Sequence, residues 1–524
     1  MRYSILFILT LVISITSCRK DFDTIPSSGK LEFSKTTVYL DTVFTNVGSS
    51  TYMLKVYNRS GDDITIPSIA LGKGSASKYR LMVDGMTGLD GSDADAIGDG
   101  KIFPNVQLLA HDSLFVFIET TADIADANPA DMLYTDEILF DAGTLQQKVN
   151  LVTLIQDAVF LFPDRTPDGN GGYSYENLLL DNSDPDSNIY GFELTDAELH
   201  FTNAKPYVIY GYAGVATGKN LIIDAGARIH FHDKSGIFVK SGGGVQVNGL
   251  PSTTTALENE VIFEGDRLEP SFAETPGQWG IIYLAEGSTN NIFNHATIKN
   301  ATVGIFVDRQ DPTTVQITNT QIYNASNYGI VARKGKINGN NIVINNAGKS
   351  SLACILGGTY DFVHCTFTDF WTNSSRQSPA VYLDNTYTEN EIIYVSDLVA
   401  NLTNCIIYGP NNIELGLNRN NSGLFNHQIK NCLIKFNDTN NQFSSNPLYT
   451  SVFALSNNNL MSNNTTPFDP KFKNTSRNNL RIGLTSAATG NANSNAPYYI
   501  NLDADGNPRT FPNSDIGAYE HSSN

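Results

Sequence analysis

Short apolar strands recur at a nearly constant interval along the second half of the chain. Each repeat centres on one apolar residue, with a small residue or Asn two positions before it. The central residues are Ile298, Ile322, Val343, Phe367, Ile407 and Ile434, at separations of 24, 21, 24, 40 and 27 residues. An interval in the low twenties, with apolar alternation between turns, is typical of a solenoid in which each repeat forms one coil. The pattern therefore predicts stacked parallel β-strands.

Polar turn residues stand at both ends of these repeats. They are His295, Asn319, Asn340, His364, Asn404 and Asn431 before the central residues, and Asn300, Asn324, Asn345 and Asp369 after them. Asn accepts left-handed backbone geometry and forms Asx-turns, so the 21 Asn among residues 401–480 favour a chain that turns often. Low-complexity disorder is the alternative, but the interleaved Ile, Leu, Val and Phe positions argue against it.

The same texture of short strands and glycines begins near residue 160. At about 22–25 residues per coil, residues 160–460 would form about 12 coils. The 40-residue step between Phe367 and Ile407 then requires one coil with an insertion, which we expect within residues 372–396.

Residues 30–157 carry a different pattern. Apolar strands such as 37–44, 52–58 and 113–118 are separated by Gly, Asp and Asn turns, which predicts a β-sandwich. Residues 47–58 and 64–71 resemble the immunoglobulin-like domains of cilia- and spindle-associated proteins and of many bacterial surface proteins. That resemblance implies a spacer or interaction module.

The N-terminus predicts a targeting segment. Arg2 precedes an apolar run over residues 5–15, which is too short to span a bilayer as a mature helix. The following Ile15-Thr16-Ser17-Cys18 resembles the lipobox of bacterial lipoproteins, which implies a signal peptide over 1–17, a diacylglycerol on Cys18 and a tether over 18–29. We expect a lipid-anchored outer-membrane protein facing the cell surface or the periplasm; an ordinary signal peptide is the alternative.

Three further segments resemble right-handed parallel β-helix lipoproteins of Gram-negative bacteria. They are Pro276-Gly277-Gln278-Trp279-Gly280-Ile281, Asn300-Ala301-Thr302-Val303-Gly304-Ile305 and the closing Asp515-Ile516-Gly517-Ala518-Tyr519-Glu520, the last preceded by the similar segment 502–509. The resemblance implies an all-β chain with a right-handed β-helix over 158–464 and a closing segment over 465–524. Such proteins include polysaccharide lyases, glycan binders and adhesins, so the fold does not settle the activity.

Charge and cysteines narrow the function classes. The net charge of −19, without a Lys/Arg cluster, opposes binding to nucleic acid. Cys365, Cys405 and Cys432 share one repeat position, and stacked strands about 4.8 Å apart hold Cβ atoms poorly for a disulfide. We therefore expect these three, with Cys354, to be free thiols in the core.

Outward residues beside the central column form the first candidate binding surface. They are Thr297, Lys299, Gln321, Tyr323, Ile342, Ile344, Thr366, Thr368, Ile406, Tyr408, Leu433 and Lys435. Such a ladder would bind an extended glycan by stacking and hydrogen bonds, with Lys299, Tyr323, Trp371, Tyr408 and Lys435 as the predicted ligand-binding residues. A solvated sheet face is the competing interpretation. We expect a non-catalytic binder of polysaccharide or another surface ligand.

The alternative function is a polysaccharide lyase or glycoside hydrolase near residues 361–376. Asp361, His364, Asp369 and Arg376 offer acid, base and guanidinium groups beside Trp371. However, His364 and Asp369 coincide with turn positions, which explains both without catalysis. The chain lacks the clustered Asp triad with a partner Arg that resemblance to calcium-dependent pectate lyases would require. It also lacks the paired-Asp and Gly-His-Gly patterns of polygalacturonases.

We predict no cofactor, and calcium is the one metal that the sequence suggests. Asp90, Asp93, Asp95 and Asp99 lie in a Gly-rich loop whose oxygen density suits Ca²⁺. Their spacing does not follow an EF-hand, which favours a solvated acidic loop over a calcium site.

Overall fold

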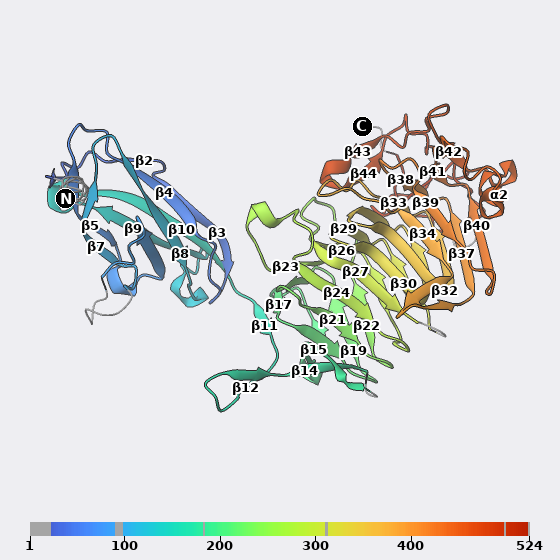
Figure 1. Ribbon diagram of the computed structural model, residues 1–524, viewed down its shortest axis with the longest axis horizontal. Helices are drawn as coiled ribbons and strands as arrows, with labels where there is room; N and C mark the ends of the chain where they lie inside the picture. Colours follow the sequence, from blue (N-terminus) through green and yellow to red (C-terminus); the bar gives the residue numbers. More distant parts are fainter. Residues whose placement is uncertain (1–22, 90–97, 182–183, 310–312, 497–498, 522–524) are drawn as a thin grey trace, which may run out of the picture. The chain divides into compact units, whose positions relative to one another are not determined.

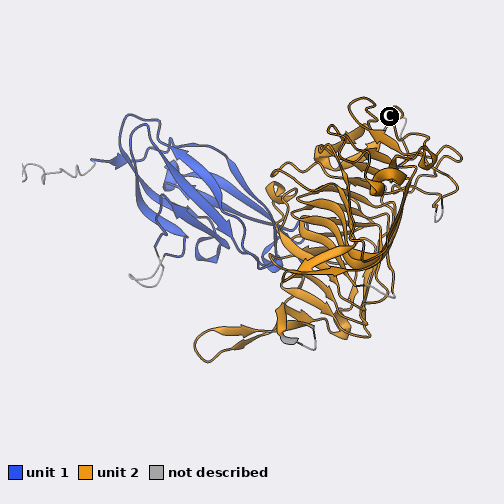
Figure 2. Ribbon diagram, turned by 45° about the vertical axis from the view of Figure 1, so that its right-hand side comes forward, with its two compact units in different colours: residues 1–157 blue, residues 158–524 orange. Residues whose placement is uncertain are grey.

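The computed structural model describes residues 23–89, 98–181, 184–309, 313–496 and 499–521. The chain divides into two compact units, Met1–Asp157 and Ala158–Asn524, shown in different colours in Figure 2. Cys18 and the predicted signal peptide lie outside the described residues, as do Asp90, Asp93 and Asp95.

Two β-sheets enclose a single hydrophobic core in the first unit. Strand β8 shows why: its residues alternate between half-buried and buried, so one face turns to the core and one to solvent. The larger sheet contains β1 (Ile25–Pro26), β3 (Thr37–Phe44), β5 (Ile64–Leu71), β7 (Ile102–Leu108), β9 (Leu133–Phe140) and β10 (Gln147–Gln156). The smaller contains β2 (Glu32–Phe33), β4 (Tyr52–Tyr57), β6 (Tyr79–Val83) and β8 (Ser113–Thr120). The immunoglobulin-like resemblance itself stays a prediction.

The second unit is a parallel β-helix, as the sequence predicts. Figure 1 shows its strands stacked in chain order. Every neighbouring pair in its eleven-stranded sheet is parallel, which is the pairing that coil-on-coil stacking produces. The strands are β11 (Val159–Leu161), β17 (Tyr207–Ile209), β20 (Arg228–Phe231), β23 (Val261–Gly265), β26 (Ala296–Lys299), β29 (Gln321–Ala325), β31 (Val343–Ala347), β33 (Thr366–Thr368), β38 (Ile406–Tyr408), β41 (Leu433–Lys435) and β42 (Leu460–Ser462).

A larger sheet forms the remaining walls of each coil. It contains β14 (Asn177–Asp181), β15 (Asp184–Glu193), β16 (His200–Phe201), β18 (Tyr212–Val215), β19 (Asn220–Asp224), β21 (Gly236–Val239), β22 (Gly244–Asn248), β24 (Trp279–Leu284), β25 (Ile292–Asn294), β27 (Ala301–Asp308), β28 (Val315–Thr318), β30 (Tyr328–Asn340), β32 (Ser350–Val363), β34 (Val381–Asp384), β37 (Leu398–Thr403), β39 (Leu415–Asn418) and β40 (Phe425–Lys430). Its inward side chains share one core with those of the eleven-stranded sheet.

The central column of the repeat differs from the predicted one at a single coil. Strand pairing aligns Ile298, Ile322, Ile344, Phe367, Ile407 and Ile434, so Ile344 takes the place predicted for Val343. Ile342, Val343 and Ile344 are three apolar residues in a row, and alternation alone does not choose among them. Ile342 and Ile344 point into the core, whereas Val343 points outward beneath a second layer of chain.

Two ladders of turn residues flank these strands, again shifted by one residue at the same coil. His295, Asn319, Asn341, His364, Asn404 and Asn431 all adopt left-handed backbone angles, with φ between 46° and 56°. The side-chain amide of Asn341 donates to Asn319 at 2.8 Å, and that of Asn346 donates to Asn324 at 2.6 Å. The side-chain amides of successive coils thus form hydrogen bonds with one another at the positions where the backbone turns.

The predicted insertion and the free thiols are both present. The 40-residue step contains a loop around Arg376 and an antiparallel hairpin, β35 (Thr386–Glu389) with β36 (Ile392–Val395). Cys354, Cys365, Cys405 and Cys432 are buried and unbonded to one another. The Cys432 thiol accepts the Cys405 backbone N–H at 3.4 Å, which fits a stacked column of core sulfurs.

The remaining elements are small. They are the hairpins β12 (Arg165–Pro167) with β13 (Tyr173–Tyr175) and β43 (Phe472–Asn474) with β44 (Asn479–Ile482), the helix α2 (Pro447–Phe453), and the 3₁₀ turns η1 (Gly74–Ala76), η2 (Ile124–Asp126), η3 (Gly143–Leu145), η4 (Asp196–Glu198), η5 (Pro270–Phe272), η6 (Leu455–Asn457) and η7 (Thr475–Arg477). Among the described residues, no helix has both the length and the apolarity needed to cross a bilayer.

The first prediction concerns the central column. Phe367 is fully buried, so Phe367→Ala leaves a cavity between two coils and should lower the free energy of unfolding by about 3–5 kcal/mol. Urea unfolding monitored by circular dichroism measures the loss. Thr388→Ala, at an exposed position of the β35–β36 hairpin, is the matched control and should change little. Equal effects of the two changes would contradict the stacked column.

Candidate functional site

The outer face of the eleven-stranded sheet does not lie open as predicted. Residues 463–496 and 499–521, here called the C-terminal segment, cover much of it. Ile406 and Leu433 pack against Ile482, Ala488 and Ile516 of that segment. Val343 packs against Leu480, Ala518 and Tyr519. The apolar residues of the predicted ladder therefore form a second, thinner core rather than a ligand surface.

The closing motif fastens this segment to the sheet. The Ala518 N–H donates to the Thr366 hydroxyl at 3.0 Å, and the Tyr519 hydroxyl donates to the Gln321 side-chain carbonyl at 3.1 Å. Gly517 has φ of 98°, and a Cβ there would lie 2.7 Å from the Ile406 side chain, so only glycine fits. Arg509 donates to the carbonyls of Gly517 and Ala518 and pairs with Glu520.

An open groove lies at the edge of the area that the C-terminal segment covers, beside strands β23 to β29. Its volume is about 670 Å³. Residues of three regions line it: Pro251, Ser252, Thr253, Thr254, Thr255, Leu257 and Glu260 of the loop before β23; Gln321 and Tyr323 of β29; and Arg477, Asn478, Asn479, Arg481, Ala504, Asp505 and Asn507 of the C-terminal segment. Amides, hydroxyls and two guanidinium groups in this lining lie beside apolar residues such as Pro251 and Leu257, a mixture that suits a ligand with both hydroxyls and apolar faces.

Glu260 is the buried carboxyl of the groove. Its side chain accepts hydrogen bonds from the Thr297 hydroxyl at 2.6 Å and from the Gln321 amide at 3.3 Å. Burial raises the pKa of Glu260, and its hydrogen bonds with Thr297 and Gln321 lower it by less. The Tyr323 hydroxyl donates to the same Gln321 side chain, so one hydrogen-bond network holds three sheet residues in place.

Ion pairs and short-range hydrogen bonds fix the groove walls. Arg481 donates from Nε to one Asp505 oxygen at 2.6 Å and from a terminal nitrogen to the other at 2.5 Å, and its guanidinium lies 4.6 Å from the Tyr519 ring centre. In the facing loop, both Thr253 and Thr254 hydroxyls donate to Glu258. A preformed groove loses less entropy on binding than a flexible one. Arg477 is exposed and lines the same groove.

The structure does not gather the predicted catalytic residues into one accessible site. His364 is fully buried, accepts the Asn404 amide at 3.0 Å, and lies beneath the C-terminal segment, with its ring 5.2 Å from Tyr499. Burial, together with the positive charge of Arg509, holds the pKa of His364 well below its ordinary value. Asp361 lies on the other sheet, where it accepts the Asn401 amide at 2.7 Å.

Asp369 and Arg376 instead form a buried ionic cluster with Glu414. Arg376 binds both Glu414 oxygens, at 2.6 and 2.9 Å, and lies 3.6 Å from Asp369. The Asp369 carboxylate also accepts the Ala347 N–H at 3.0 Å. These groups fasten the loop of the inserted coil onto the helix, so their contacts are structural. Burial raises the pKa of Asp369 to about 8, more than Arg376 lowers it.

Of the five residues predicted to bind ligand, Tyr323 lies in the groove. Lys299 pairs with Glu264 at 2.6 Å beside it. Trp371 donates to the Ser374 hydroxyl at 2.9 Å near the inserted loop. Tyr408 lies under Phe472 of the C-terminal segment, with Lys435 over its ring at 5.9 Å. The predicted residues thus spread along the sheet, and the covering segment separates them.

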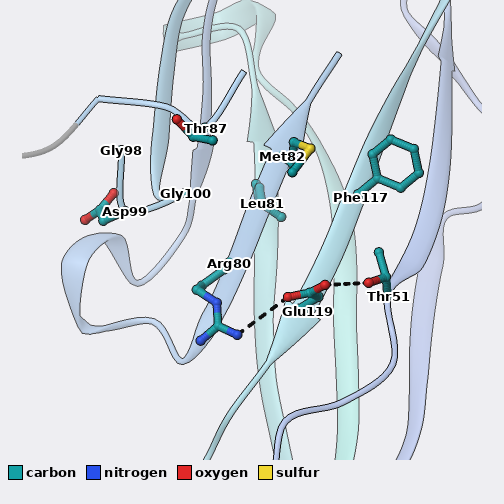
Figure 3. Close-up of a pocket in the computed structure, with 10 residues that line it drawn as sticks. All are labelled: Thr51, Arg80, Leu81, Met82, Thr87, Gly98, Asp99, Gly100, Phe117 and Glu119. Carbon is teal, nitrogen blue, oxygen red and sulfur yellow. Dashed lines mark hydrogen bonds and ion pairs between the residues drawn. The ribbon is translucent and has the colours of Figure 1, made fainter. Parts of the chain in front are cut away.

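The fourth calcium candidate, Asp99, lines a 430 Å³ cavity of the first unit, drawn in Figure 3. It accepts the Lys101 N–H, while Glu119 across the cavity is bound by Arg80 and Thr51.

In the second unit, Asp515, Glu520 and His521 place three potential ligand atoms within 4.8 Å of one another. The Asp515 carboxylate accepts a hydrogen bond from the His521 ring, and Glu520 pairs with Arg509. The side chains of this cluster therefore already have partners within the C-terminal segment.

Sequence reasoning missed the contribution of the C-terminal segment to the groove. Arg477, Arg481 and Asp505 lie more than 150 residues from Gln321 and Tyr323 in the chain. The closing motif was the available signal, because a segment with so many specific turn residues must dock on a defined surface.

Comparisons with known proteins agree with the fold. Residues 188–367 match the family model of a right-handed beta helix region. No curated protein matches the chain. The match to the family model covers about a third of the chain, and it supports the β-helix that strand pairing shows.

Solved structures share only a distant likeness. The catalytic domain of a GH87 alpha-1,3-glucanase is 10% identical, covering 73% of this chain and 82% of its own, with a TM-score of 0.20. The ASH/PapD-like domain of human CEP192 is 15% identical over 26% of this chain and 90% of its own, with a TM-score of 0.15. A family 123 glycoside hydrolase from Clostridium perfringens is 7% identical over 25% of this chain and 30% of its own, with a TM-score of 0.17. Such low scores carry no inference about activity.

The second prediction uses the buried cluster. The folded-state pKa of Asp369, about 8, exceeds its ordinary value of 3.8, so the folded protein binds more protons between these values and loses stability as pH rises through them. Asp369→Asn removes this titration. Its melting temperature should therefore fall less between pH 5 and pH 8.5 than that of the unaltered protein. The exposed Asp233→Asn is the control, and parallel curves for all three proteins would refute the assignment.

Proposed function

We propose that this protein binds a polysaccharide, without cleaving it, in the groove between the β-helix and its C-terminal segment. The observation that carries the proposal is the lining: amides, hydroxyls, two guanidinium groups and Tyr323 around about 670 Å³. Sugars present hydroxyls for polar partners and apolar ring faces for aromatic ones. The rigid walls fixed by Arg481–Asp505 and by Glu258 support the proposal, because they keep these groups in place before the ligand arrives.

Hydrolysis in the same groove is the alternative. A glycoside hydrolase needs two carboxyl groups beside the scissile bond, and Glu260 and Asp505 are the carboxyl residues that line the groove. Asp505 is engaged by Arg481, and Glu260 by Thr297 and Gln321. Because both carboxyls already have strong hydrogen-bond or ion-pair partners, the groove favours glycan binding over hydrolysis. The original alternative near residues 361–376 has less support, since its groups are buried or lie apart.

The third prediction tests binding. On a glycan array, the full chain should retain a defined subset of glycans, and Arg477→Ala should weaken that binding by about tenfold through loss of a charged donor. Arg477 is exposed, so its removal should leave the melting temperature unchanged. Arg419→Ala, an exposed arginine outside the groove, is the matched control. Equal binding by both variants would place the ligand elsewhere.

The same glycans distinguish binding from hydrolysis. Incubation with the full chain should release no new reducing ends and no ultraviolet-absorbing unsaturated uronates. If reducing ends form and Glu260→Gln abolishes them, the groove is a hydrolase site and the non-catalytic proposal is wrong.

We also propose that Cys18 carries a lipid anchor, on the strength of the lipobox-like Ile15-Thr16-Ser17-Cys18. The fourth prediction follows: Cys18→Ala should move the protein from the membrane fraction to the soluble fraction. Protease treatment of intact cells reports which side of the outer membrane it faces. Unchanged membrane association of the variant would contradict acylation at Cys18.

A further inference from the structure

A cluster of exposed aromatic rings surrounds another cavity, at the start of the β-helix. The cavity measures about 380 Å³ and is lined by Phe162, Pro163, Arg165, Tyr175, Tyr190 and Tyr210, here called the aromatic cleft. Phe162 is 58% exposed, Tyr175 48% and Tyr190 43%. Soluble proteins seldom leave several large aromatic side chains exposed together unless they bind something.

Local contacts position the three tyrosine rings of the cleft. Tyr175 meets Tyr190 edge-on, with ring centres 5.6 Å apart. Tyr210 stacks on His232 at 4.5 Å, and Asp266 fixes His232 through a 2.7 Å contact. Gly211 lets the Tyr190 and Pro163 side chains come close to the backbone, because a Cβ there would lie 3.0 Å from Tyr190 and 3.1 Å from Pro163. These contacts position the three tyrosine rings of the cleft before a ligand binds.

The chemistry of the cleft selects its occupant. Ring faces and edges offer apolar contact, while the lining also includes three tyrosines and Arg165, whose hydroxyls and guanidinium can form hydrogen bonds. No carboxylate belongs to this lining. A pyranose ring has the matching pattern, since it carries apolar C–H faces and polar hydroxyls on its edge. The volume lies within the range of small-ligand sites.

The cleft lies next to the ends of two strands of the sheet that carries Gln321 and Tyr323 of the groove. Pro163 comes shortly after β11, and Tyr210 directly follows β17, while the groove involves β29. Four strand spacings separate β17 from β29, a distance of about 19 Å along the sheet. Tyr190 lies on β15 of the larger sheet, and Arg165 and Tyr175 lie on the β12–β13 hairpin, so both sites belong to the second unit.

We propose that the aromatic cleft is a second sugar-binding site, which holds a pyranose ring by stacking and acts together with the groove on long glycans. The cleft needs no ligand in the groove, and only the joint action rests on the proposed function. Two sites on one polymer make the second contact intramolecular, which raises the apparent affinity by about 10²–10⁴ without any new contact.

The fifth prediction tests the cleft with defined probes. Cellotetraose, xylotetraose, mannotetraose and tetragalacturonate, with the corresponding polymers, are titrated into the full chain by calorimetry. Phe162→Ala and Tyr175→Ala should each weaken tetrasaccharide binding at the cleft about tenfold. Tyr394→Ala, a tyrosine of similar 45% exposure on the β35–β36 hairpin, is the matched control and should change nothing. Two exposed positions are used so that a folding defect in one does not hide the result.

The outcomes separate the two sites. If Phe162→Ala and Tyr175→Ala lower affinity while Arg477→Ala does not, the cleft stands and the groove proposal fails. If Arg477→Ala lowers affinity and the cleft variants match Tyr394→Ala, the cleft proposal is wrong. Absence of binding by any probe to the folded full chain overturns it as well. A polymer affinity no higher than that of its tetrasaccharide refutes the joint action alone.

Discussion

Stacking of one coil on the next is the constraint on which the second unit depends. Each side chain of a coil contacts its counterparts above and below, so a residue type must suit a whole column. Ile298, Ile322, Ile344, Phe367, Ile407 and Ile434 fill one such column with apolar volume. Because parallel strands keep this register only if turns absorb every length difference, extra residues occur at turns, as in the β35–β36 hairpin.

The outer face of the eleven-stranded sheet follows from the same constraint. Stacked strands carry columns on both faces, and from β31 to β42 one outer column runs through Val343, Thr366, Ile406, Leu433 and Leu460. Apolar residues in that column need a cover, which the C-terminal segment supplies through Ile482, Ile516 and Tyr519. The groove forms where this cover ends and the sheet column becomes polar, at Thr297 and Gln321.

Two buried ionic clusters in the described part of the second unit connect segments of the chain. Arg376 joins Asp369 and Glu414, and Arg509 joins Glu520 to two carbonyls of the closing motif. Removing one partner of such a cluster leaves an uncompensated charge, which typically costs about 3–5 kcal/mol. By contrast, the groove and the aromatic cleft keep polar and aromatic groups at the surface. Their exposure leaves them accessible for the glycan contacts that we propose.

The sequence by itself determined the coil: its interval, its inward residues, its turn ladders, the place of its insertion and the free thiols. These features are local or repeat at a fixed spacing, so periodicity reports them directly. The periodicity gave the wrong central residue at Val343, because Ile342, Val343 and Ile344 are all apolar and hide the alternation. Only the tertiary structure decided which outward residues meet solvent. That outcome depends on where residues 463–521 dock, more than a hundred residues along the chain from Gln321 and Tyr323, and no short-range pattern encodes a contact between such distant segments.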